Sequence, residues 1–363
     1  MFQLKSSMGV PLERSCCKDI LASFWLFDPT HGRCLVPSRL RRKDASSRGT
    51  LFAILAATLM ASGCSSTTLT SGSNLAKVGQ TAASQMDQNA TLSSDAMLNL
   101  RKAVAFNDGF NGQIGNSSSQ TFLQNVGEIQ DNLSQYAKML ESLSGAYSAL
   151  GDLAAYDAVG TFNTSFSNLA KDSNQFLQGI HSSVQVGPVT SSAVKAGGGI
   201  VIGLVQANEV KDASRTIKVL LQTIIPVFED PGTRTLLILN KQEVTGQIDQ
   251  AAQTLFLSGV YSYGPLLDDL GGPMNFKSSP KSDTVVIKNA KLKQGLGNVA
   301  IETASEQTGQ LAASYDKSVA AMKALIPLHE SLENGAPLNV ERISGIVNQL
   351  QKIAISLQPA KGK

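Results

Sequence analysis

The chain has 363 residues, enough for one large core or for about two domains. Hydrophobic residues make up 42% of it and charged residues 16%, so the chain can bury a core and is not broadly disordered. Basic charge is concentrated in the first 63 residues, which hold nine of the 31 Lys and Arg but only four of the 28 Asp and Glu. The remainder is close to neutral with dispersed charges, which argues against nucleic-acid binding.

The segment that leads to Cys64 has an ordered composition. Basic residues between Arg39 and Arg48 precede an apolar run from Leu51 to Met60, and small residues follow at once. That run is too short to span a bilayer, which takes roughly 20 helical residues. Cys64 is the only cysteine beyond it, so the chain after this point cannot form an internal disulfide. The order of basic, apolar and small residues is typical of a signal peptide.

Residues 59–64, Leu-Met-Ala-Ser-Gly-Cys, resemble the lipobox of bacterial lipoproteins. Ser62 and Gly63 are the small residues expected before the cysteine, whereas Ala61 stands where the family usually has Leu. The resemblance covers the signal region alone, and it implies cleavage before Cys64 and attachment of palmitate-type acyl chains to it. Two or three such chains would hold the protein at a membrane essentially permanently. An ordinary secretory signal with a chance cysteine, or a short buried helix, is the alternative.

The same resemblance implies a destination and a division of the chain. In lipoproteins an Asp after the cysteine favours the inner membrane, and position 65 is Ser, so the outer membrane is implied, with the body facing the periplasm or the outside. We expect a leader and signal peptide over 1–63, a lipidated cysteine with a polar tether over 64–74, and a helical bundle domain over 75–363. Residues 1–38 exceed what a signal peptide needs, which suggests that translation begins near Leu40.

Apolar residues over 122–150 recur at alternating spacings of four and three, the heptad pattern of a helix that packs along another helix, as in a coiled coil. A second set follows over 159–180, after three glycines, and predicts a helical hairpin; one long kinked helix is the alternative. The residues of the two seams are Phe122, Val126, Ile129, Leu133, Tyr136, Leu140, Leu143, Tyr147 and Leu150, then Val159, Phe162, Phe166, Leu169, Phe176 and Ile180.

Helical spacing also recurs over 75–106, 283–332 and 340–357, and Asp230-Pro231 is typical of a helix start. The expected fold is therefore all-α, an elongated helical bundle with long heptad-patterned helices. Short strands at 260–263 and 284–288 would add a small β element near 258–288. The expected inward residues are Val78, Ala82, Met86, Met97, Leu100, Val104, Leu236, Leu239, Ile248, Leu255, Val299, Leu311, Tyr315, Val319, Met322, Ile326, Ile343, Ile346, Leu350 and Ile353.

A glycine-rich apolar run spans residues 196–205. No Lys-Ser or Lys-Thr follows it, so it lacks the residues of a phosphate-binding loop. One interpretation is a helix whose small residues let another helix approach closely. The other is a segment that inserts into a bilayer, as in proteins resembling the helical pore-forming toxins. The residues concerned are Gly197, Gly198, Gly199, Ile200, Val201, Ile202 and Gly203.

The sequence offers little catalytic chemistry. Only His181 and His329 follow the signal region, and His329-Glu330 lacks the second histidine of a zinc-protease helix. The acidic pairs at 229–230 and 268–269 lie beside Pro or Gly, where solvated turns and helix caps are expected. We therefore expect no catalytic, cofactor or metal site, no bound cofactor and no enzyme activity.

Two functions from different classes fit this pattern. The first is a lipid-anchored cell-envelope scaffold or adaptor, non-catalytic, that binds an unknown envelope protein or associates with itself through its helix seams. The second is a membrane-active helical protein that resembles pore-forming toxins and uses segment 196–205.

Overall fold

The structure is a computed structural model in which the described residues are 45–112, 117–155, 158–187, 202–238, 254, 264–271, 274, 278–279 and 288–358. Side chains are described from Ser66 onward, and in the helix that starts at Ile202 from Gln206 onward. The bundle belongs to the unit formed by residues 56–363.

All regular structure among the described residues is helical, which confirms the all-α prediction. Residues 260–263 and 284–287, where strands were considered, lie outside the described part. The helices are α1 (Ala45–Phe110), α2 (Ser117–Ala155), α3 (Val159–Gly179), α4 (Ile202–Glu229), α5 (Pro231–Thr235), α7 (Gly264–Gly271), α9 (Ala290–Asn334) and α10 (Glu341–Leu357).

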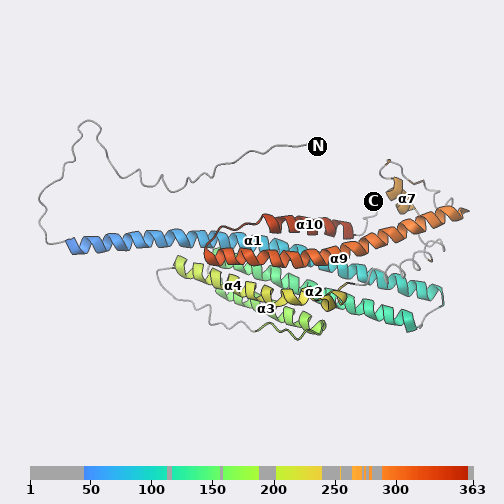
Figure 1. Ribbon diagram of the computed structural model, residues 1–363, viewed down its shortest axis with the longest axis horizontal. Helices are drawn as coiled ribbons and strands as arrows, with labels where there is room; N and C mark the ends of the chain where they lie inside the picture. Colours follow the sequence, from blue (N-terminus) through green and yellow to red (C-terminus); the bar gives the residue numbers. More distant parts are fainter. Residues whose placement is uncertain are drawn as a thin grey trace, which may run out of the picture. The chain divides into compact units, whose positions relative to one another are not determined.

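Helices α1 and α2 run antiparallel (Figure 1). Gly79 of α1 packs on the ring of Tyr147 in the second half of α2, whereas Ser119 Oγ, at the start of α2, donates to Asp108 Oδ1 near the end of α1 at 3.1 Å. Helix α10 lies on the same bundle, because Asn89 Nδ2 of α1 donates to its Leu350 carbonyl at 3.0 Å.

Helix α9 runs parallel to α2 and antiparallel to α4. His329 contacts Tyr147, and Tyr315, earlier in α9, has its ring centroid 6.5 Å from that of Tyr136, earlier in α2. Phe228, near the end of α4, accepts a 2.7 Å hydrogen bond from the Tyr315 hydroxyl, whereas Ser214, nearer its start, contacts His329. Helices α1 and α4 therefore run in the same direction and enter the bundle at the same end.

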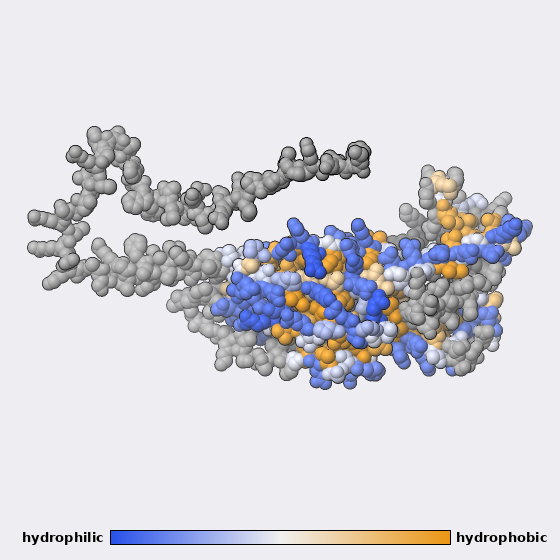
Figure 2. All heavy atoms as spheres, in the orientation of Figure 1, coloured by the Kyte–Doolittle hydropathy of each residue, from blue (hydrophilic) through white to orange (hydrophobic). Residues whose placement is uncertain are grey.

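We call this the Cys64 end, where residues 64–72 of α1 and the start of α4 lie, and the opposite one the Phe110 end, where α1 stops and α9 begins at Ala290. Five of the seven exposed large apolar residues described belong to the Phe110 end, and Figure 2 shows apolar residues gathered around α7 and the start of α9. The five are Phe106, Phe110, Leu270, Met274 and Leu292.

The two predicted seams form the centre of the core. All nine seam residues of α2 are buried, and in α3 all are buried except the partly buried Val159. Helices α2 and α3 pack along each other, which confirms the hairpin and excludes one kinked helix. Most predicted inward residues of α1, α9 and α10 are also buried, whereas Val78, Val299, Ile326 and Ile346 are partly buried.

Helix boundaries differ from the predictions in two places. Asp230 is the N-cap of α5, as predicted, and its carboxylate accepts from the Thr233 N–H at 2.9 Å, but this helix ends at Thr235. Residues 239–253 lie outside the described part. Helix α9 begins at Ala290 rather than near residue 283, because the Asn289 side chain accepts from the N–H groups of the first turn.

The segment expected as a polar tether has a different structure. Residues 65–73 continue helix α1, and within them Thr68 is 8% exposed while Leu69 packs against the core. A Cβ atom on Gly72 would lie 2.5 Å from Val210 Cγ1, so the two helices approach closely there. These small residues let α1 pack on α4. That packing stabilises a helix in a stretch whose composition alone favours a flexible chain.

Close packing at Gly79 predicts opposite effects for two Gly→Ala substitutions. In Gly79→Ala the new Cβ would overlap the Tyr147 ring, so we expect the free energy of unfolding to fall by about 1–3 kcal/mol. In Gly145→Ala, on an exposed part of α2, no atom lies within 4 Å of the new Cβ, and we expect a gain of about 0.5–1 kcal/mol from helix propensity. Urea unfolding measures both; a loss of stability in both variants would contradict this packing.

Candidate functional site: a buried histidine between three helices

The residues singled out from the sequence fall at the edge of the described part. Cys64 lies within α1, and Ile202 and Gly203 open α4, but their side chains are not described. Gly197 to Val201 lie outside the described residues. The acidic pair at 229–230 is accounted for locally, because Glu229 forms an ion pair with Lys323 and Asp230 caps α5.

The most developed polar site inside the bundle is centred on His329 of α9, which is fully buried. Its Nε2 lies 2.8 Å from the Tyr147 hydroxyl of α2, and its Nδ1 lies 2.7 Å from Ser214 Oγ of α4. A neutral imidazole has one N–H donor and one acceptor nitrogen, and a hydroxyl can play either role. Both ring nitrogens are therefore satisfied, each by a different helix.

Burial, and secondarily the positive charge of Lys218, lower the pKa of His329 to about 3. The ring is therefore neutral at pH 7, as the paired hydrogen bonds require. Because the unfolded chain binds this proton near pH 6.5, stability from the neutral ring is complete above that pH. It is lost as the pH falls from about 6.5 toward 3, by up to about 1.4 kcal/mol per pH unit.

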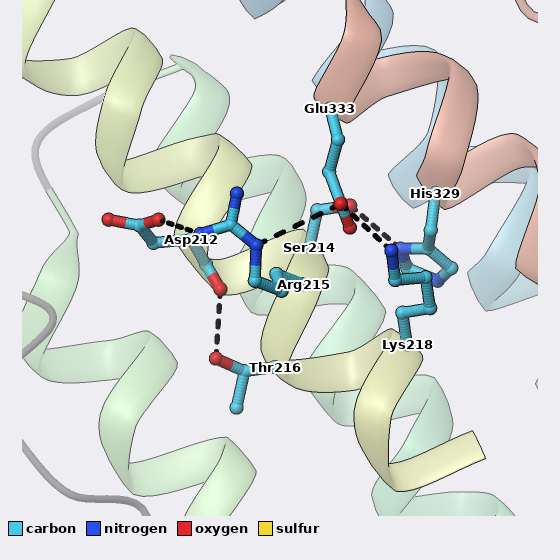
Figure 3. Close-up of polar contacts among 7 residues, drawn as sticks. All are labelled: Asp212, Ser214, Arg215, Thr216, Lys218, His329 and Glu333. Carbon is cyan, nitrogen blue, oxygen red and sulfur yellow. Dashed lines mark hydrogen bonds and ion pairs between the residues drawn. The ribbon is translucent and has the colours of Figure 1, made fainter. Parts of the chain in front are cut away.

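A group of charges lies next to the histidine, at the surface between α4 and α9 (Figure 3). Lys218 Nζ and Glu333 Oε2 are 2.8 Å apart, and each of these two side chains is 14% exposed. Arg215 Nε lies 3.8 Å from the same oxygen and its Nη1 donates to Asp212 Oδ1 at 3.0 Å. The largely buried Lys218–Glu333 pair joins the same two helices as the Ser214–His329 contact, one turn further along α4.

The arrangement does not support nucleophilic catalysis. A serine beside a histidine resembles half of a catalytic triad, but both ring nitrogens of His329 contact hydroxyl groups, so no carboxylate orients the ring. The residue is also closed off from solvent, so a substrate has no access to it. The role of this site is structural: its hydrogen bonds connect α2, α4 and α9 and fix these helices in register.

Two hollows lie elsewhere in the bundle. A cavity of about 20 Å³, room for about one water molecule, is lined in part by Tyr136 and Ser318, and the buried Tyr136 hydroxyl interacts at most weakly with Ser318. An open groove of about 600 Å³ runs between the end of α3 and α5, and His181 on its wall has a positive φ of 57°. His181 follows the C-cap of α3 in the left-handed conformation that glycine usually adopts, and its N–H donates to the Gln178 carbonyl at 3.0 Å.

Across the described ranges, no cluster of three or more His, Cys, Asp or Glu side chains is arranged to hold a metal ion. Within the same ranges, no helix has a stretch both long and apolar enough to cross a membrane.

Sequence reasoning missed the histidine site, although a signal was present. His329 lies seven residues after Met322, so it continues the apolar seam of α9 and is placed to point inward. Ser214 occupies the corresponding face of α4, between the buried Val210 and Ile217. A polar residue at a seam position is the pattern that marks a buried hydrogen-bonded contact, but its partners come from other helices and have no sequence spacing in common.

Comparisons with protein-family models, with curated proteins and with solved structures find no match to this chain.

The histidine site predicts a difference between two Tyr→Phe substitutions in the same helix. Tyr147→Phe leaves Nε2 of the buried His329 without a partner, so we expect the free energy of unfolding to fall by about 1–3 kcal/mol. Tyr136→Phe removes a buried hydroxyl that interacts at most weakly with Ser318, and we expect a loss below about 1 kcal/mol. Denaturant unfolding compares the two; equal losses would mean that the Tyr147–His329 hydrogen bond contributes nothing.

Proposed function

We propose that this protein is a lipid-anchored scaffold or adaptor of the bacterial cell envelope, without catalytic activity. The observation that carries the proposal is the lipobox-like segment 59–64 and its context: a basic stretch, an apolar run and small residues lead directly to the only cysteine in the rest of the chain. Acyl chains on Cys64 would fix the bundle to a membrane, and Ser65 after the cysteine favours the outer membrane.

The bundle supports an adaptor rather than an enzyme. Its buried polar groups link helices to one another, and its heptad seams are filled by helices of the same chain, so the seams are not free for a partner. The exposed apolar side chains described gather instead at the Phe110 end, where Phe106 and Phe110 stack with ring centroids 6.3 Å apart. Exposed apolar residues in a group are typical of a protein-binding surface, so we place the partner's contact at that end.

The anchor is tested by Cys64→Ser expressed in a Gram-negative host. We expect loss of the lipid mass from the mature protein and release of the protein from the membrane fraction, because the acyl chains supply the membrane affinity. Ser66→Ala is the matched control, since it changes an exposed residue two positions beyond Cys64 and leaves the proposed lipidation residue in place. Intact mass and membrane fractionation give the readout; a wild-type protein that carries no lipid would reject the proposal.

A second function, membrane permeabilisation through segment 196–205, is favoured by the position of α4. The contact between Gly72 and Val210 places the start of α4 at the Cys64 end of the bundle. Gln206 Nε2 donates to the Leu153 carbonyl of α2 at 2.8 Å, which fixes this start against the neighbouring helix. An apolar run that leads into α4 would thus enter the bundle where the proposed lipid lies.

Deletion of Gly197 to Gly203 separates the two functions. If the protein permeabilises membranes, the wild type releases dye from lipid vesicles and the deletion variant loses most of this release, because the apolar segment is gone. Circular dichroism checks that the variant keeps its helices. Release by the wild type that the deletion leaves unchanged would eliminate segment 196–205 as the membrane-active element.

A further inference from the structure

Folded structure begins almost immediately after Cys64. Thr68 is buried, Leu69 packs against the core and Gly72 lies in close contact with Val210 of α4. With a rise of ~1.5 Å per residue, the helix separates Cys64 from Thr68 by only about 6 Å along its axis. A lipid on Cys64 would therefore be joined to the bundle by one turn of helix instead of by a flexible chain.

The first turn of α4 lies level with Cys64. Helices α1 and α4 run in the same direction, and Cys64 precedes Gly72 by about two turns, as Ile202 precedes its partner Val210. Helices α2 and α3 join near this level, because Ala154 at the end of α2 also lies against Gly72. The Cys64 end is thus a surface formed by several helix ends, with the proposed lipid at its edge.

We propose, on the basis of the proposed lipid anchor, that the Cys64 end is a membrane-contacting surface and that the bundle stands end-on on the lipid bilayer. Acyl chains on Cys64 must lie in the hydrocarbon region, and one turn of helix then brings the packed end of the bundle to the headgroups. Helix α1 carries the Phe110 end about 70 Å away from the membrane. The apolar residues at that end thereby face a partner that is not in the same bilayer.

The sides of the bundle favour this orientation over one in which the helices lie flat. A helix in the membrane interface needs a continuous apolar face. Of the exposed large apolar residues described, only Val219 of α4 and Ile355 of α10 lie away from the Phe110 end. Two isolated side chains of this kind do not form a continuous apolar face on the described sides of the helices.

Site-directed spin labels on the lipidated protein test the orientation. Asn208→Cys puts a label on the exposed face of α4 near the Cys64 end, and Gln120→Cys puts one at the start of α2, at the Phe110 end. The natural cysteines do not take up label, because Cys64 is lipidated and the others leave with the leader. Each protein is reconstituted in vesicles of phosphatidylethanolamine and phosphatidylglycerol that contain a nickel-chelating lipid, and relaxation enhancement by the nickel reports proximity to the surface.

We expect strong enhancement for the label at 208 and at most a tenth of that effect at 120. Strong enhancement at both positions would mean that the bundle lies flat, and weak enhancement at both would mean that it hangs on a flexible chain; either overturns the inference. A glycine–serine insertion of about 20 residues after Ser65, which spans roughly 25 Å, is the control and is expected to abolish the difference. Intact mass distinguishes failure of the proposed function from failure of the proposed orientation. A protein without lipid on Cys64 contradicts the proposed function. A lipidated protein whose labels at 208 and 120 show equal relaxation enhancement contradicts the orientation alone.

Discussion

The bundle depends on helices that approach closely enough for one buried imidazole to connect three of them. His329 of α9 reaches hydroxyl groups of α2 and α4 at once, and the ring of its partner Tyr147 is in turn covered by the backbone of α1 at Gly79. A buried polar group without a partner costs about 1–3 kcal/mol, so these helices are held in a single register rather than in several sliding ones. Uniform apolar seams would fill the core but would not discriminate between registers.

The register of the helices sets the geometry of the proposed function. Since Cys64 of α1 lies level with the start of α4, the lipobox-like segment and the glycine-rich run lead into the same end of the bundle, although about 130 residues separate them in the sequence. The exposed apolar side chains described collect at the other end. The proposed adaptor would thus contact the membrane at one end and a partner protein at the other, with the bundle setting the distance between them.

Much of the fold could be predicted from apolar spacing, because the apolar residues of a helix lie on the face that contacts its neighbour. The seams from Phe122 to Leu150 and from Val159 to Ile180 identified α2, α3 and the turn between them. Asp230 and Pro231 marked a helix start by local hydrogen bonding, which needs no tertiary information. Apolar spacing does not identify α4 beyond its first residues. The composition of residues 65–73 predicts a tether, because only the tertiary contact of Gly72 with Val210 shows that small residues there serve helix packing.

The sequence by itself determined the all-α class, the α2–α3 hairpin and the pattern around Cys64 that suggests a lipid anchor, because periodicity, capping and signal composition are local properties of a chain. Tertiary structure alone decided that Ser214, Tyr147 and His329 meet, that Cys64 of α1 lies level with the start of α4, and that α1 packs within one turn of Cys64. These are contacts between residues far apart in sequence, and their energies depend on which helix faces which, so no spacing along the chain encodes them.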